Sequence, residues 1–139
     1  MWGQDQQPMI EFFLPQTPGE WLAWLTALGT AVTGLALLLF PMRLMTHMGF
    51  ALFGGRPDGL AELRGPIGGY FLGTGLVALA LHPQPLVYLA IGAGYLFAVI
   101  GRLISILFDG ARDGKIFFWL IVELIAAVAP LSYALGYIR

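Results

Sequence analysis

Apolar residues dominate four long stretches of this sequence, and each stretch is long enough to cross a lipid bilayer. The four stretches cover residues 18–40, 60–81, 85–108 and 115–138. A spanning helix needs about 20 predominantly apolar residues, and none of the stretches shows the alternation that is typical of a strand. The sequence therefore predicts an all-α protein, in which a four-helix transmembrane bundle at residues 18–139 follows an extracytoplasmic tail at residues 1–17.

Residues at the ends of these stretches carry signals that start or stop a helix. Thr17, Pro18 and Glu20 stand where an N-cap, a first helical residue and a reciprocal capping glutamate are expected. The His-Pro-Gln-Pro turn at residues 82–85 ends the second stretch. Pro130 lies inside the fourth stretch, where it removes one backbone hydrogen bond and is expected to kink the helix.

The connection between the first two stretches is too long for a tight turn and has an amphipathic pattern of its own. On a helix, Met42, Met45 and Met48 fall near one face, while Arg43 and His47 fall on another. This pattern favours a short helix that lies in the membrane interface.

Composition agrees with a membrane location and excludes several kinds of chemistry. Hydrophobic residues make up 58% of the chain and charged residues 11%, whereas an ordinary soluble domain is about 25% charged. The formal net charge of −1 gives no general attraction to nucleic acid. The chain has no cysteine, so disulfides, thiolate metal ligands and cysteine nucleophiles are excluded.

The lysines and arginines are distributed unevenly between the two ends of the predicted helices. Only Arg139 falls on the side where the chain begins. The other six fall on or near the side reached after the first helix: Arg43, Arg56, Arg64, Arg102, Arg112 and Lys115. The positive-inside rule therefore predicts cytoplasmic loops at residues 41–59 and 109–115, with both termini on the outer side.

Several polar residues lie within the predicted helices, where a charge costs about 2.5–3.5 kcal/mol on insertion scales. Arg102 and Glu123 lie at similar depth on antiparallel neighbours and are predicted to pair. Arg64 is expected to reach the interface, Asp58 or Asp109. One cluster in the inner half of the bundle is predicted from Glu62, Arg64, Arg102, Ser105, Asp109 and Glu123.

Small residues share faces with these polar residues. Gly65, Gly69 and Gly73 follow the small-xxx-small spacing that lets helices approach closely, and Gly94 and Ala98 extend the face of Arg102. We therefore expect all five residues to face the interior of the bundle.

Three interpretations of the polar cluster remain open at this point. The cluster is a structural ion-pair network, a ligand, proton or substrate site that opens inward, or a contact with another protein, and charge pairing alone does not separate these. His47 is expected in a solvated loop and His82 at the opposite interface, so the two cannot share a metal or haem. The sequence predicts no metal site and no catalytic residue.

Two motifs among these residues resemble a known family. Residues 62–69, ELRGPIGG, resemble its pattern E-x-R-small-x-x-G-G, and residues 101–110, GRLISILFDG, resemble its pattern G-R-x-x-S-x-x-x-D-G; Glu123 completes the set. This is an uncharacterised family of small bacterial membrane proteins, a domain of unknown function similar to the DoxX/DoxD-like group. The resemblance covers about residues 18–138 and implies a four-helix fold in the bacterial inner membrane, with both termini periplasmic.

The resemblance brings no established activity, because function does not follow from fold. Relatives in the wider group are linked to quinone-coupled oxidation or to the assembly of other membrane proteins. Our leading hypothesis is a non-enzymatic accessory or assembly subunit that contacts another membrane protein, or a second copy of itself, among membrane lipids. The alternative is a binding or redox-linked site for a lipophilic molecule such as a quinone or lipid, and a proton-coupled transporter is the third hypothesis.

Overall fold

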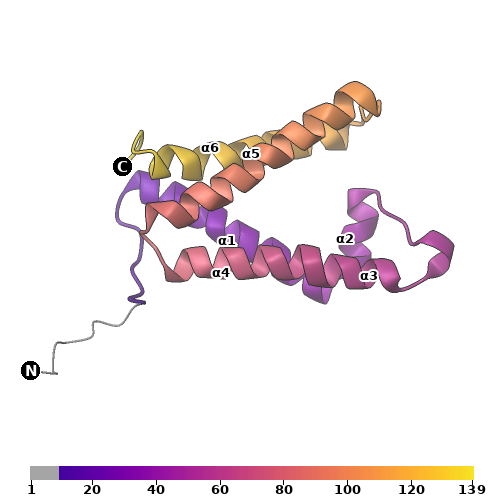
Figure 1. The fold of residues 1–139 in the computed structure, drawn as a ribbon, viewed down its shortest axis with the longest axis horizontal. Helices are drawn as coiled ribbons and strands as arrows, with labels where there is room; N and C mark the ends of the chain where they lie inside the picture. Colours follow the sequence, from indigo (N-terminus) through magenta and orange to yellow (C-terminus); the bar gives the residue numbers. More distant parts are fainter. Residues whose placement is uncertain (1–9) are drawn as a thin grey trace, which may run out of the picture.

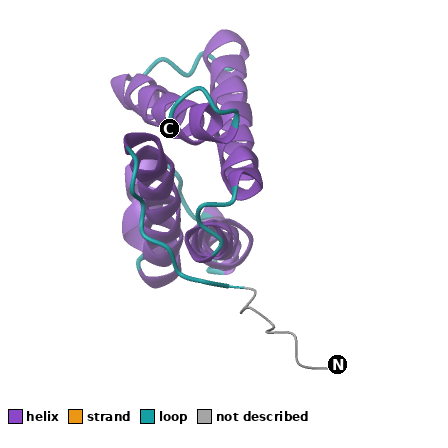
Figure 2. Cartoon of the chain, turned by 90° about the vertical axis from the view of Figure 1, so that its left-hand side faces the viewer, coloured by secondary structure: helices purple, strands orange, loops and turns teal. Residues whose placement is uncertain are grey.

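The computed structural model describes residues 10–139, which form helices and connecting loops without any strand (Figures 1 and 2). Residues 1–9 of the predicted tail lie outside the described residues. The elements are α1 (Pro18–Leu39), α2 (Pro41–Met48), the 3₁₀ turn η1 (Phe53–Gly55), α3 (Asp58–Glu62), the π-helical segment η2 (Leu63–Gly69), α4 (Tyr70–Ala80), α5 (Pro85–Phe108) and α6 (Gly114–Ala134). The all-α prediction is confirmed for this part of the chain.

Three of these helices, α1, α5 and α6, are long and apolar enough to cross a membrane. The second predicted stretch, residues 60–81, is also helical, but it consists of three segments that follow one another directly. α3, η2 and α4 together run from Asp58 to Ala80. Pro66 lies inside η2, and its missing N–H and its ring both disturb the regular α-helical pattern. The wider π turn accommodates this proline.

Local signals placed the ends of α1 correctly, while α6 is shorter than predicted. Thr17 is the N-cap of α1, and its hydroxyl accepts a 3.3 Å hydrogen bond from the N–H of Glu20. The Glu20 carboxylate accepts from the N–H of Gln16 at 2.7 Å, one residue before the predicted partner. α6 continues through Pro130 and ends at Ala134, because Gly136 adopts φ 78° and closes a Schellman motif.

The connection between α1 and α3 contains the predicted short helix. α2 ends at Gly49, whose φ of 81° is the left-handed conformation that favours glycine. Met45 is buried against Leu37 and Leu63, while Met42 and Met48 are exposed. One of the three methionines therefore anchors α2 to the first and second helical stretches.

The helices pack as two pairs that meet at one end (Figure 1). The first pair is α1 with η2 and α4, and the second pair is α5 with α6. The pairs meet where α1 begins, where α4 turns into α5 and where the chain ends, which we call the terminal end. They diverge toward the loop end, which carries α2, α3 and the α5–α6 loop.

Within the first pair, α1 and α4 are in backbone contact. A Cβ added to Gly34 would lie 2.1 Å from the backbone nitrogen of Leu72, and one added to Gly75 would lie 2.5 Å from that of Ala31. Ala23 and Ala27 continue the contact on α1 and are fully buried. Small residues on both helices thus allow the close approach.

The glycines that supply this contact differ from the predicted ones. A Cβ added to Gly65, Gly73 or Gly94 would meet nothing within 4 Å, and one added to Gly69 would meet a carbonyl of its own helical stretch at 3.7 Å. Ala98 is exposed. The expectation that these five residues face the interior is therefore wrong. For Gly65, Gly69 and Gly73 the expectation assumed a regular helix, whereas the π segment changes which residues share a face. Gly94 and Ala98 lie on the regular helix α5, on a part of its surface that the other helices leave uncovered.

We predict that Gly75→Ala destabilises the protein while Gly73→Ala does not. The two glycines are two positions apart on α4, but the methyl group at residue 75 must push α1 away, whereas residue 73 faces open space. Overpacking of this kind costs about 1–3 kcal/mol. Thermal unfolding in detergent measures the difference, and equal melting of the two variants would show that the α1–α4 contact is not close.

Candidate functional site

The predicted pairing of Arg102 with Glu123 is confirmed. Arg102 on α5 donates two parallel hydrogen bonds to the Glu123 carboxylate on α6, from Nε to Oε2 at 2.7 Å and from Nη2 to Oε1 at 2.5 Å. This bidentate geometry is the strongest that an arginine makes with a carboxylate. The pair joins two consecutive helices, as expected for neighbours linked by a short loop.

The Arg102–Glu123 pair is only partly buried. The side chain of Arg102 is 27% exposed and that of Glu123 is 16% exposed, although both lie well inside helices that are long and apolar enough to span a membrane. Tyr95, two turns before Arg102 on α5, still contacts the first pair through a 2.8 Å hydrogen bond to Thr30 of α1. The ion pair lies farther along α5 than Tyr95, toward the loop end.

The other residues of the predicted cluster make separate contacts. Ser105 donates to the Asp109 carboxylate at 2.7 Å, one turn along the same helix. Glu62 is exposed and lines a pocket of about 390 Å³ beside α2, together with residues that include Met45 and Leu63. The prediction of one inner cluster is therefore wrong, because its members are divided between the two helix pairs and make four different sets of contacts, counting that of Arg64.

Arg64 has a partner that sequence reasoning did not name. Its Nη1 donates to the backbone carbonyl of Leu38 in the last turn of α1, while Asp58, one of its expected partners, pairs with Arg56 at 2.5 Å. The last carbonyls of a helix have no partner within the helix, and a positive charge is favourable at that end of the helix dipole. Arg64 therefore acts as a C-terminal cap for α1.

A second polar group, missed by the sequence analysis, lies at the terminal end. His82 is 2% exposed, so it is enclosed by protein in the turn between α4 and α5. Its Nδ1 lies 2.7 Å from the hydroxyl of Tyr88 on α5, and its Nε2 lies 3.8 Å from Oε2 of Glu20 on α1. The Tyr133 hydroxyl of α6 donates to the Pro83 carbonyl at 3.0 Å. We call Glu20, His82, Pro83, Tyr88 and Tyr133 the junction.

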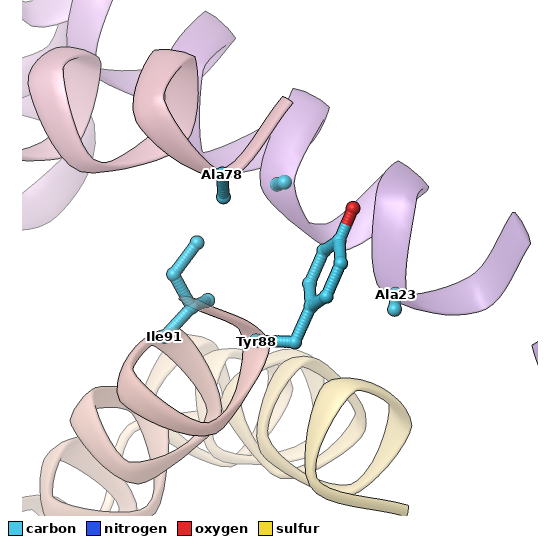
Figure 3. Close-up of a cluster of buried hydrophobic side chains, with 5 residues drawn as sticks. Ala23, Ala78, Tyr88 and Ile91 are labelled. Atoms are coloured by element: carbon cyan, nitrogen blue, oxygen red, sulfur yellow. The ribbon is translucent and has the colours of Figure 1, made fainter. Parts of the chain in front are cut away.

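Tyr88 and His82 form the buried centre of the junction. Tyr88 is fully buried and points from α5 toward α1, with Ala23 and Ala78 nearby (Figure 3). Burial lowers the pKa of His82, and the nearby Glu20 carboxylate opposes that change. Within residues 10–139, Nε2 of His82 and Nε1 of Trp24 are buried without a hydrogen-bond partner. No motif or spacing in the sequence indicated that this histidine would be enclosed.

Neither polar group has the composition of a metal centre. Among the described residues, no three histidine, aspartate or glutamate side chains come together as metal ligands. The Arg102–Glu123 pair offers a hydrogen-bond donor beside a carboxylate, and the junction offers an imidazole between a phenol and a carboxylate. These arrangements suit the binding of a polar group or of a proton.

The fold is thus that of an α-helical protein whose long helices are consistent with a membrane location. The chain belongs to the family described as a domain of unknown function (DUF4345), whose model matches residues 19–135. The match covers α1 to α6 and both polar groups. Searches of curated proteins and of solved structures found no match.

We predict strong energetic coupling between Arg102 and Glu123. Arg102→Met or Glu123→Gln alone leaves the partner charge uncompensated, at about 3–5 kcal/mol for a fully dry site and less here because the pair is partly exposed. The double variant should lose at least about 1 kcal/mol less than the sum of the single losses. Unfolding of the four proteins in detergent gives this double-mutant cycle, and additive losses would show that the residues act independently.

Proposed function

We propose that this protein is a bacterial inner-membrane protein of the DoxX-like type with four spanning helices. The spans are α1, residues 58–80, α5 and α6, and α2 lies in the cytoplasmic interface. The apolarity of α1, α5 and α6 supports this, as does the unbroken helical course of residues 58–80. In this arrangement the terminal end is periplasmic and the loop end is cytoplasmic, since six of the seven lysines and arginines lie toward the loop end.

We further propose that the protein is an accessory or assembly subunit that binds a segment of another membrane protein. The observation that carries this proposal is the partial exposure of the Arg102–Glu123 pair, on helices that have diverged from the first pair (Figure 1). A charged pair in hydrocarbon faces protein or water rather than lipid. In the described chain, Nη1 of Arg102 is not used in the pairing with Glu123. A polar side chain on a partner helix would accept its hydrogen bond.

The open glycine face provides a second surface for such contacts. A Cβ added to Gly65 or Gly73 would meet nothing within 4 Å, so each glycine leaves room at its own position for a neighbouring helix to approach closely. Gly34 and Gly75 pack the first pair internally, whereas Gly65 and Gly73 stay open. The open positions are suited to contact a further helix.

A lipophilic molecule with a polar head, such as a quinone or a lipid, is the second candidate. It is favoured by the same unused Nη1 donor, because a quinone carbonyl or a lipid phosphate oxygen accepts a hydrogen bond as well as a protein side chain does. The two candidates place different molecules against the same atom, so one experiment separates them.

The topology predicts opposite labelling of two exposed positions. Single cysteines replace Gln84, in the turn between α4 and α5, and Arg112, in the loop between α5 and α6; both positions are exposed. In intact cells an impermeant maleimide should label the cysteine at position 84 and should label the one at position 112 only after the membrane is opened. The reverse pattern would invert the topology, and labelling of both would contradict the span assignment.

The accessory role predicts face-specific crosslinking beside the ion pair. A photoreactive residue at Ala98, one turn from Arg102, should crosslink to one discrete protein in native membranes. The same residue at Phe97 is the matched control, because it lies at equal depth, is 70% exposed and points away from the Arg102 face. The adduct should disappear in the Arg102→Met and Glu123→Gln double variant.

The alternative outcomes of this experiment are equally informative. An adduct with the mass of a lipid or a quinone at Ala98 would replace the accessory role by the second candidate. Identical adducts at both positions, or adducts that persist without the ion pair, would show that Arg102 and Glu123 do not form the contact surface.

A further inference from the structure

We infer that the junction is a proton-binding site, and that protonation of His82 loosens the contact between the two helix pairs. The junction lies where the pairs meet, since it draws Glu20 from α1, Tyr88 from α5 and Tyr133 from α6 around the turn that follows α4. The inference uses neither the Arg102–Glu123 pair nor the proposed partner. It rests on which groups surround the imidazole and on how their hydrogen bonds can be arranged.

Within residues 10–139, the polar groups around His82 come from three helices. α1 contributes the Glu20 carboxylate at 3.8 Å from Nε2, and α5 contributes the Tyr88 hydroxyl at 2.7 Å from Nδ1. α6 contributes Tyr133, whose hydroxyl donates to the carbonyl of Pro83, the residue that follows His82. α4 contributes the apolar Ala78 to the surrounding core. The backbone of Arg139 lies against Gly19 in the first turn of α1, and its side chain is exposed.

These neighbours favour one arrangement of protons on the neutral imidazole. A proton on Nε2 points toward the Glu20 carboxylate, whereas a bare Nε2 would set its lone pair against that carboxylate. Nδ1 is then an acceptor, and the Tyr88 hydroxyl donates to it. In this arrangement both buried groups of the 2.7 Å contact are satisfied.

Adding a proton to His82 breaks this arrangement. The imidazolium carries a proton on Nδ1 as well, so the Tyr88 hydroxyl can only accept from it, and the hydroxyl proton must find another acceptor. Tyr88 is fully buried, and among residues 10–139 its hydroxyl has a hydrogen bond to His82 alone. Protonation therefore takes from the Tyr88 hydroxyl proton the one acceptor that it has among these residues. It also buries a positive charge with Glu20 at 3.8 Å, outside hydrogen-bond distance.

The sign of the pH dependence follows from these costs. Burial lowers the pKa of His82 in the folded protein, with Glu20 opposing the change, so the unfolded chain binds this proton at higher pH than the folded protein does. Stability is then fully present above the usual histidine pKa of about 6.5, and it falls as the pH drops below that value. For one proton, the equilibrium constant for unfolding rises by up to about tenfold for each pH unit of acidification.

The position of the junction turns this loss of stability into a local opening. The two pairs diverge away from the terminal end (Figure 1), and Tyr88 is the largest fully buried hydrophobic side chain of the core that joins them there. Within the proposed topology this end faces the periplasm, so its proton would come from outside the cell. Acidification should therefore open the contact around residues 82–91 before it affects the Arg102–Glu123 region.

The test compares the full-length protein with four variants by thermal unfolding in detergent between pH 5 and pH 8. The parent should melt several degrees lower at pH 5.5 than at pH 7.5. His82→Asn should remove this difference, while His47→Asn should keep it, because His47 is the other histidine and is exposed. Glu20→Gln should enlarge the drop in melting temperature at low pH, since the carboxylate that opposes the lowered pKa of His82 is gone. Tyr88→Phe should reduce it, because no hydroxyl proton is left unsatisfied.

A second measurement keeps the inference testable if His82→Asn fails to fold. Backbone hydrogen exchange of the parent should quicken on acidification at residues 82–91, relative to the intrinsic rate, and stay unchanged at residues 102–123. An NMR titration of the parent should place the pKa of His82 below about 6.5. A pKa above that value, an acid loss that persists in His82→Asn, or equal exchange changes in both regions would each overturn the inference.

Discussion

The backbone contact between α1 and α4 is the constraint on which the rest of the structure depends. Gly34 and Gly75 leave no room for a side chain between the two helices, so their relative position is determined by backbone atoms. This contact brings the start of α1 to the same end as the turn that follows α4. Glu20 and His82, more than sixty residues apart in sequence, become neighbours as a result. α5 is then held at that end by Tyr88 and by the bond between Tyr95 and Thr30.

The sequence allowed good prediction wherever local chemistry decides the outcome. The capping residues of α1, the helical stretches, the short helix after α1 and the Arg102–Glu123 pair were all expected. The pair was predictable because α5 and α6 are joined by a short loop, so depth along one helix determines depth along the next. The end of α6 was misplaced because apolar residues continue past Gly136, whose conformation closes the helix.

Other features depend on contacts that spacing does not reveal. The glycine face of residues 65–73 was assigned on a regular helix, and the π segment around Pro66 invalidates that assumption. His82 was expected at the interface, as a residue before a proline, and its enclosure by protein was not expected. Its burial depends on Tyr88, Tyr133 and Glu20 arriving from three other helices. Arg64 donates to a backbone carbonyl of α1. Every residue has such a carbonyl, so the sequence does not indicate which one a side chain will contact.

The Arg102–Glu123 pair also has a consequence for how the chain enters a bilayer. Both partners belong to consecutive helices, α5 and α6, which are linked by a short loop. The second hairpin therefore contains its own charge neutralisation and does not depend on α1 or α4 to lower the cost of inserting an arginine and a glutamate. Within the proposed topology, α5 and α6 can therefore leave the translocation machinery together as a paired unit. In the first hairpin, by contrast, Arg64 obtains its bond from α1, a helix that is already made when Arg64 is synthesised.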